Sequence, residues 1–151
     1  MLLETAMLGQ IGYEEEDIVT FANGIPGFEG CRQYIVIRQD AEEPIAYLQS
    51  VEEARLHFLM IDPFYVCKKY EFKLEEADLA ELEIGSEEQV QVWSIVTAHE
   101  DVQETTLNLL APIIINQYTR KGKQIILHSS PYRTKHKLSE MMAAVGGSGG
   151  A

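Results

Sequence analysis

The feature that most constrains this chain is an apolar pattern with a period of two. Every second position from 107 onward is apolar: Leu107, Leu109, Ala111, Ile113 and Ile115. Successive side chains of an extended chain point to opposite faces, so this alternation predicts a strand with one buried face. Pro112 cannot donate a ladder hydrogen bond, and it predicts a sheet edge, a bulge or a corner within that strand.

Short stretches of the same kind recur at regular spacing. They predict strands at Leu3–Ile11, Asp17–Phe21, Gln33–Arg38, Ile45–Val51, Leu56–Ile61, Tyr70–Leu74, Val90–Thr97, Leu107–Ile115 and Gln124–His128. Turn-forming pairs separate several of them: Asn23-Gly24, Pro26-Gly27, Glu29-Gly30, Asp62-Pro63 and Lys121-Gly122. Because closure of a sheet removes exposed strand edges, this arrangement favours a mainly β, antiparallel fold, either a small barrel or a sandwich.

One or two short helices complete the predicted fold. Glu75–Leu82 places leucines between acidic residues, and Lys135–Ala144 carries apolar residues at helical spacing. A chain of 151 residues is long enough to bury roughly two-thirds of its unfolded surface around one core. We therefore predict a single domain over residues 1–145. The Gly/Ser-rich residues 146–151 have the composition of a flexible, added linker.

Charge is divided unevenly along the chain. Residues 1–110 carry 23 acidic and 6 basic side chains, and residues 111–151 carry 1 acidic and 6 basic, so net charges of −17 and +5 give the total of −12. The negative surface potential that a net charge of this size creates attracts basic partners and repels nucleic acid, which favours function through protein binding. The basic residues of the C-terminal part are Arg120, Lys121, Lys123, Arg133, Lys135 and Lys137. Two interpretations of them stay open: they bind RNA, or they pair with acids of this chain or of a partner.

No segment predicts secretion or membrane insertion. Cys31 and Cys67 lie 36 residues apart, with no CxxC pair and no signal peptide before them, which favours reduced thiols in the cytoplasm. The longest apolar runs are far shorter than the ~20 residues that a membrane-spanning helix needs. We therefore expect a cytoplasmic protein.

Motifs for catalysis, cofactors and metals are absent from the sequence. No histidine lies in an HxH or HExxH arrangement, and there is no GxSxG nucleophile motif or phosphate-binding loop. Cys67 lies in an apolar run and is predicted to be a small buried hydrophobic residue. The many adjacent carboxylates are typical of a solvated surface. A hydrolase that uses surface carboxylates or Cys67 is the enzymatic alternative.

Four motifs, taken in their order, resemble a known family. They are Phe-Ala-Asn-Gly-Ile-Pro-Gly-Phe-Glu at 21–29, Tyr-Leu-Gln-Ser-Val-Glu-Glu at 47–53, Phe-Leu-Met-Ile-Asp-Pro at 58–63 and Thr-Leu-Asn-Leu-Leu-Ala-Pro-Ile-Ile-Ile-Asn at 106–116. The set resembles the flagellar assembly factor FliW over about Leu3 to Leu138. These motifs are expected to determine the fold, with Gly24 and Gly27 shaping a turn and Phe28 filling the core.

The resemblance implies a non-enzymatic cytoplasmic protein of compact β-barrel-like fold, without a cofactor, that acts in flagellum biogenesis. It implies two alternative partners: flagellin, the filament subunit, toward which it is chaperone-like, and CsrA, a small dimeric RNA-binding protein that represses flagellin translation. In that family, FliW bound to CsrA away from its RNA-contacting surface relieves the repression, and secretion of flagellin frees FliW to do so. A dimeric CsrA implies two copies of this chain per dimer, a 2:2 complex.

Interface residues are predicted from exposed charge and not from the resemblance. The first choice is the acidic stretch formed by Glu71, Glu75, Glu76, Asp78, Glu81 and Glu83. The second choice is the pair Glu42 and Glu43. An acidic body docked beside a basic RNA-binding protein lowers its affinity for RNA by charge repulsion, without covering the RNA site.

Overall fold

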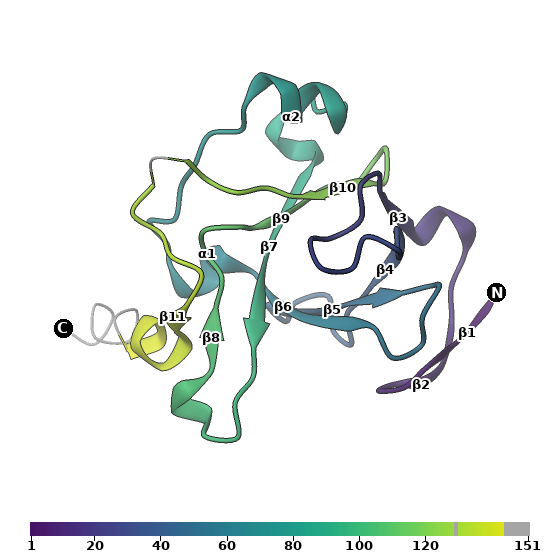
Figure 1. Ribbon diagram of the computed structural model, residues 1–151, viewed down its shortest axis with the longest axis horizontal. Helices are drawn as coiled ribbons and strands as arrows, with labels where there is room; N and C mark the ends of the chain where they lie inside the picture. The colour runs from purple at the N-terminus through teal and green to yellow at the C-terminus, as the bar shows by residue number, and fades with distance from the viewer. Residues whose placement is uncertain (129, 144–151) are drawn as a thin grey trace.

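Seven strands form a closed barrel in the computed structural model, which describes residues 1–128 and 130–143 (Figure 1). These strands are β3 (Ile18–Phe21), β4 (Gln33–Ile37), β5 (Ile45–Ser50), β6 (His57–Ile61), β7 (Val90–Thr97), β9 (Ile113–Asn116) and β10 (Lys121–Gln124). Hydrogen-bonded neighbours follow the order β7, β6, β5, β4, β3, β10 and β9, and β9 pairs with β7 to complete the ring. The predicted mainly β, barrel-like fold is confirmed. One pair, β10 with β3, is parallel, whereas the sequence predicted an antiparallel sheet.

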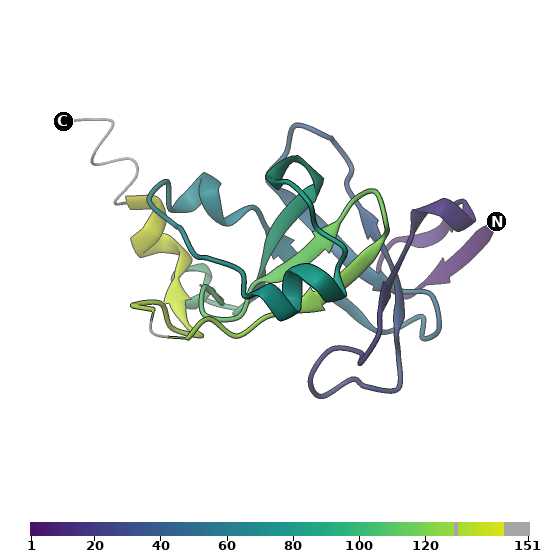
Figure 2. The same cartoon turned by 90° about the horizontal axis from the view of Figure 1, so that it is seen from above.

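The remaining strands lie at two ends of the barrel (Figures 1 and 2). A separate hairpin of β1 (Leu2–Thr5) and β2 (Gly9–Gly12) lies at one end. At the other end, β8 (Thr106–Leu107) pairs with the last residues of β7, and β11 (His136–Lys137) pairs with β8. The helices are α1 (Pro63–Val66), α2 (Glu76–Glu81) and residues 138–143, with 3-10 turns at Glu15–Asp17, Glu87–Gln89 and Val102–Glu104.

Two hydrophobic cores lie on opposite faces of the barrel wall. The first fills the barrel interior and consists of Val19, Phe21, Ile25, Tyr34, Ala46, Leu48, Met60, Trp93, Ile113 and Ile115. The second lies outside the barrel, beneath α1 and the end of α2, and consists of Ile61, Val66, Tyr70, Leu82, Val96, Leu107, Leu109, Ile114, Ile125 and Leu127. Because β9 separates the two cores, all four of its residues are buried.

The apolar run that predicted one strand, Leu107–Ile115, is two strands joined by a corner. The Oδ1 atom of Asn108 accepts hydrogen bonds from the N–H groups two and three residues later (3.1 and 2.9 Å), which folds the chain into a turn. The sequence predicted an edge, a bulge or a corner at Pro112, and the structure has a corner immediately before it, at residues 108–111. The predicted single apolar face is wrong, because Leu107 lies in the second core and Ile113 in the first.

Three other strand predictions differ from the structure. The strand predicted at Gln124–His128 is β10 at Lys121–Gln124, so the Lys121-Gly122 pair, which was predicted to form a turn, lies within a strand. Leu3–Ile11 is a hairpin and not one strand, because the chain reverses before Gly9, whose φ is +70°. Tyr70–Leu74 contains no strand. Its apolar residues are instead explained by packing: the Tyr70 ring is buried in the second core, and its hydroxyl donates a hydrogen bond to the Leu109 carbonyl (2.7 Å).

The helices begin and end close to the predicted residues. α2 lies within the predicted Glu75–Leu82. The C-terminal helix begins at residue 138 and not at Lys135, because His136 and Lys137 pair with β8. The predicted domain end at residue 145 and the Gly/Ser tail at 146–151 lie outside the described residues.

The Gly-Ile-Pro-Gly motif forms a loop that closes one end of the barrel. Gly24 has a φ of +69°, and a Cβ atom there would lie 2.7 Å from the Cα of Glu29. Ile25, which is 2% exposed, fills the core. Phe28 was expected to fill the core but is 44% exposed. Its ring packs edge-on against the Phe58 ring, with 5.3 Å between the two ring centroids.

Gly122 permits the parallel contact between β10 and β3. A Cβ atom at this position would lie 2.7 Å from Cζ of Phe21 and 2.9 Å from Cγ1 of Val19, inside the first core. We expect Gly122→Ala to lower the free energy of unfolding by about 1–3 kcal/mol through overpacking, measured by chemical denaturation. Gly30→Ala is the matched control, because the methyl group that alanine would add there has no heavy atom within 4 Å and the φ of Gly30 is not in the left-handed region. Equal stability of the two variants would contradict this explanation.

His136 forms a pH-dependent hydrogen bond within the C-terminal segment. Its Nε2 atom accepts a hydrogen bond from the Arg133 N–H (2.9 Å), and burial, with a smaller effect of the Arg133 charge, lowers the pKa of His136. The unfolded chain therefore binds the proton more tightly. The contribution of neutral His136 to stability is complete above the pKa of about 6.5 that its imidazole has in the unfolded chain, and it is lost as the pH falls through the lower pKa of the folded chain.

We expect hydrogen exchange of the Arg133 amide, corrected for its intrinsic pH dependence, to accelerate between about pH 7.5 and about pH 5.5. The variant His136→Ala should show no such change, since it has no imidazole to protonate. Constant protection of the Arg133 amide across this range in the unaltered chain would refute the assignment.

Candidate functional site

The acidic residues 71–83 form a segment that crosses one side of the barrel and includes α2 (Figure 1). We call this segment and its surface the α2 face. The helix has acidic residues in its first turn, Glu76 and Asp78, where they interact favourably with the helix dipole. Leu82, at its C-terminal end, is 1% exposed and anchors it in the second core.

A buried amide fixes the end of α2 to the barrel. Asn116, at the end of β9, is fully buried, and its Nδ2 atom donates hydrogen bonds to the carbonyls of Leu82 (2.8 Å) and Glu83 (3.2 Å). Its Oδ1 atom accepts hydrogen bonds from the N–H groups of Tyr118 and Thr119 (3.0 and 3.2 Å). One side chain therefore joins a barrel strand, a turn and the α2 face.

Lys123 of β10 forms a second connection to α2. Its Nζ atom lies 2.7 Å from Oδ1 of Asp78 and 2.6 Å from Oε2 of Glu81. The Asp78 side chain is only 13% exposed, so this pair is partly shielded from water. Hydrogen bonds to Asp78 and then Glu81 raise the pKa of Lys123 above its ordinary value. A third pair joins Lys121 to Glu83 at 3.3 Å, with both side chains about half exposed.

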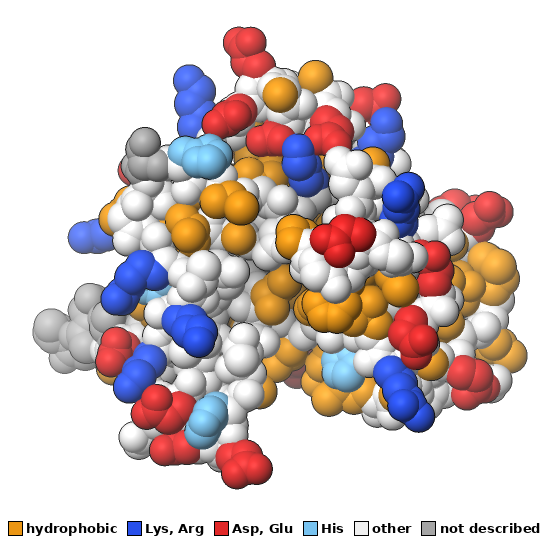
Figure 3. All heavy atoms as spheres, viewed as in Figure 1, with side chains coloured by type: hydrophobic (Ala, Val, Ile, Leu, Met, Phe, Trp, Pro, Cys, Tyr) orange, Lys and Arg blue, Asp and Glu red, His pale blue; other side chains and the backbone are white. Residues whose placement is uncertain are grey.

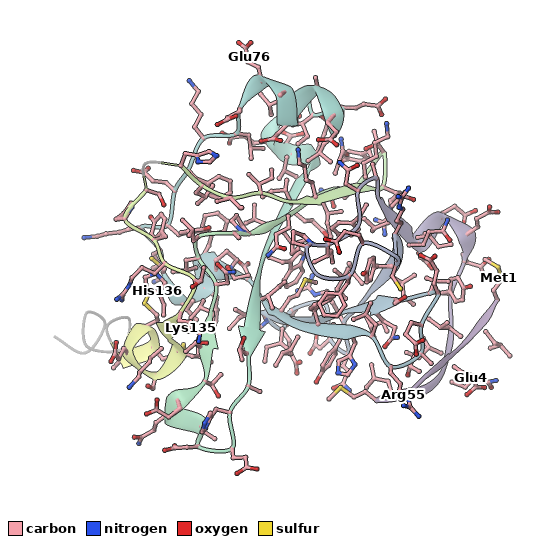
Figure 4. The ribbon with its side chains drawn as sticks, in the orientation of Figure 1. Met1, Glu4, Arg55, Glu76, Lys135 and His136 are labelled. Carbon is pink, nitrogen blue, oxygen red and sulfur yellow. The ribbon has the colours of Figure 1, made fainter. Side chains whose placement is uncertain are left out.

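The predicted acidic stretch therefore divides into two groups. Asp78, Glu81 and Glu83 form ion pairs with β10 and hold the fold together. Glu71, Glu75 and Glu76 are exposed, and none of them forms an ion pair within the described residues 1–128 and 130–143. Figure 3 shows acidic side chains gathered over α2 at the top of the view, and Figure 4 shows Glu76 pointing outward there.

The second predicted pair, Glu42 and Glu43, lies in the loop between β4 and β5. Both residues are exposed. Asp40 accepts a hydrogen bond from the Glu42 N–H (2.9 Å), and the Arg38 guanidinium donates one to the Glu43 carbonyl (2.6 Å). Among the described residues, no hydrogen bond or ion pair joins this loop to the α2 face, so the structure does not unite the two predicted groups.

A groove that the sequence did not predict lies beside the α2 face. It has a volume of about 630 Å³ and lies between residues 71–78 on one side and residues 123–128 and 130–132 on the other. Ile126 lines it and is 58% exposed, whereas its neighbours Ile125 and Leu127 are buried. The alternation of these residues was visible in the sequence, but the identity of the segment across the groove was not.

Comparison with known proteins identifies the family. Residues 2–138 match the family model described as FliW protein. The flagellar assembly factor FliW of Thermosipho africanus is 47% identical over 134 residues, covering 88% of this chain and 92% of that protein. That of Bacillus subtilis is 39% identical over 138 residues, covering 91% and 96%. The chain belongs to the FliW family. A crystal structure of the flagellar assembly factor FliW matches it with a TM-score of 0.85 and 39% identity, covering 91% of this chain and 96% of that one.

The motifs that carried the resemblance to the FliW family build turns. Gln49 is 1% exposed, and its Nε2 atom lies within 3.1–3.4 Å of four backbone carbonyls around the β5–β6 turn. The Glu52 carboxylate accepts hydrogen bonds from the N–H groups of Gln33 and Arg32 (2.8 and 2.7 Å), which lower its pKa. The expectation that these motifs determine the fold agrees with this geometry.

Three of the six basic residues in the C-terminal part of this FliW-family chain form ion pairs with its own acids. Lys121 and Lys123 contact the α2 face, and Lys137 lies 3.4 Å from Glu104. Arg120 donates a hydrogen bond to the Asp17 carbonyl (2.8 Å). Pairing within the chain therefore accounts for Lys121, Lys123 and Lys137, and RNA binding by the C-terminal basic residues stays a prediction.

Cys67 ends α1 and packs against the second core. Its N–H donates to the Pro63 carbonyl (2.9 Å), and its side chain is half-buried. In the part of the chain that the structure describes, no cluster of three or more His, Cys, Asp or Glu side chains has the geometry to hold a metal ion. None of the described helices is long and apolar enough to span a membrane.

The partly shielded Lys123 pair should matter more to stability than the exposed Lys121 pair. We expect Lys123→Met to lower the free energy of unfolding by about 1–2 kcal/mol, because Asp78 and Glu81 lose their counter-ion. Lys121→Met is the matched control, with an expected loss within about 0.5 kcal/mol. Urea denaturation near neutral pH measures both. Equal losses would contradict the distinction.

The same pair has a defined pH dependence. Because the folded pKa of Lys123 is raised, its contribution is complete below the unfolded pKa of about 10.4 and is lost as the pH rises through the folded pKa. The stability difference between the Lys123→Met variant and the unaltered chain should therefore shrink as the pH rises into the strongly alkaline range.

Proposed function

We propose that this chain is a non-enzymatic regulator of flagellar assembly that binds flagellin and the RNA-binding protein CsrA in the cytoplasm. In this proposal, binding to CsrA relieves its repression of flagellin translation, and flagellin competes as the alternative, chaperoned partner. One observation carries the proposal: Glu71, Glu75 and Glu76 are exposed and form no ion pair within the described residues. Membership of a family whose relatives are named flagellar assembly factors supports it.

The physical basis is electrostatic antagonism. A protein that binds RNA presents a basic surface, because counter-ion release from phosphates supplies much of the affinity. A body with a net charge of −12 docked beside that surface makes the local potential less favourable for phosphate, even if it leaves the RNA site uncovered. The α2 face is suited to this role because Asn116 and Lys123 hold it in a fixed position.

The symmetry of the partner sets the expected assembly. CsrA is proposed to be a dimer with two equivalent docking surfaces, so two copies of this chain should bind to give a 2:2 complex. Light scattering of the purified complex measures this stoichiometry directly.

Charge reversal at the three unpaired carboxylates tests the function. We expect the triple variant Glu71→Lys, Glu75→Lys, Glu76→Lys to require at least about tenfold more protein to release labelled RNA from CsrA at low salt. The difference should shrink as salt approaches about 1 M, where the Debye length is about 3 Å. Fluorescence anisotropy of the RNA provides the measurement.

The matched control reverses three exposed glutamates elsewhere on the surface: Glu15→Lys, Glu16→Lys and Glu100→Lys. Both triples change the net charge from −12 to −6, so they separate the position of the charge from its total. RNA release that is equally impaired in both triples would assign the effect to total charge. Unimpaired release by the α2-face triple would refute the proposed site.

A further inference from the structure

The wall of the groove beside α2 is a strand that continues beyond the end of β10. In the ladder between β10 and β9, Lys123 faces Ile114 and Gln124 faces Ile113. The same antiparallel register extends further, because the Ile125 N–H donates to the Pro112 carbonyl (3.0 Å) and the Leu127 N–H donates to the Leu110 carbonyl (2.8 Å). Residues 123–127 are therefore extended and paired along one edge.

The other edge of this strand is open. β3 pairs with β10 only at Lys121 and Gly122 and then diverges. In an antiparallel ladder the backbone groups of alternate residues point to opposite edges, so those of Ile126 point away from the paired edge. The N–H groups of Ile126 and His128 form no hydrogen bond within residues 1–128 and 130–143. This open edge faces the groove of about 630 Å³.

The opposite wall of the groove also presents unpaired backbone groups. Residues 71–75 belong to no helix or strand, and the Glu71 N–H is held by the Tyr132 hydroxyl (3.2 Å). The N–H groups of Phe72, Lys73 and Leu74 form no hydrogen bond with any other described residue. N–H groups without a partner among the described residues therefore occur on both walls of the groove.

We propose that this groove binds an extended peptide segment of a partner protein, which adds to residues 123–128 as a further strand. Main-chain hydrogen bonds to the open edge supply the affinity, as in other cases of strand addition. The partner segment is basic and apolar in alternation. One row of its side chains contacts the apolar rings of Phe72 and Tyr132, which line the groove, and the other row lies at the level of Ile126.

Charge complementarity specifies the basic row. Glu71, Glu75 and Lys73 line the groove and form no ion pair within the described residues, so two unpaired carboxylates stand against one unpaired ammonium, and the positive charge of Lys123 is already matched by Asp78 and Glu81. Lys or Arg side chains at alternate positions of the partner segment would therefore meet unpaired carboxylates. This inference rests on the proposed function in one respect: it describes how a partner that binds the α2 face would be bound.

A synthetic peptide tests the mode of binding. The probe is an acetylated and amidated peptide of about seven alternating valine and lysine residues, matching the length of the open edge. Two analogues carry N-methyl groups either on every valine or on every lysine. In a strand, the N–H groups of alternate residues point to opposite edges. When all the valines face the barrel, either the valine N–H groups or the lysine N–H groups point to residues 123–128, but not both.

We expect calorimetry with the full chain to show binding of the unmodified peptide. One analogue should bind at least about tenfold more weakly, and the other should bind within about threefold of the unmodified peptide. Equal affinity of all three peptides would overturn strand addition, as would the absence of binding.

A pair of protein variants tests the same edge from the other side. Ile126→Pro removes the outward N–H without breaking a hydrogen bond within the described residues, and Ile126→Ala keeps that N–H while removing the side chain. We expect the proline variant to lose at least about tenfold in peptide affinity relative to the alanine variant. Thermal unfolding of both establishes that they fold, and the N-methyl analogues test the proposal in the unaltered chain in any case.

The outcomes separate this inference from the proposed function. Complex formation with CsrA on a sizing column, together with no peptide binding, would refute the groove and leave the function standing. Peptide binding that depends on the N–H set, together with no complex with CsrA or flagellin, would support the groove and refute those partners.

Discussion

The position of the acidic surface depends on one buried amide. Asn116 satisfies two carbonyls at the end of α2 and two N–H groups of the following turn, and it lies at the end of a strand that is buried on both faces. An amide with four backbone partners is costly to replace, since each buried group left unpaired costs about 1–3 kcal/mol. The Lys123 pair adds a second connection from the neighbouring strand. The barrel therefore fixes the position of the acidic segment that carries the unpaired carboxylates.

The acidic residues have two different roles, and the structure separates them. Asp78 and Glu81 neutralise a lysine of the barrel, so their charge is not available to a partner. Glu71, Glu75 and Glu76 have no such role among the described residues and contribute to the field outside the molecule. Acidic and basic residues that are far apart in the sequence are therefore close together in the fold, because Lys121 and Lys123 of β10 lie beside the acidic segment.

The sequence predicted the mainly β class, most strand positions and an edge, bulge or corner at Pro112, because periodicity and turn chemistry are local properties. It did not predict that Leu107 and Ile113 lie in different cores, because the turn built by Asn108 changes which face is buried. It assigned a strand to Tyr70–Leu74, whose apolar residues instead contact segments far away in sequence, such as Leu109 and Tyr132. Composition identified the candidate acids, but predicting that Asp78, Glu81 and Glu83 form ion pairs required knowing that β10 lies beside α2. Predicting the groove required the same long-range information.

Hydrogen–deuterium exchange of this chain, free and in complex with CsrA, tests most directly whether the α2 face is where the partner binds. Binding at the α2 face predicts new protection at residues 71–76 and 124–128, with unchanged exchange in the β1–β2 hairpin at the far end of the barrel. Protection confined to that hairpin, or to the loop that contains Glu42 and Glu43, with no change at residues 71–76, would contradict it.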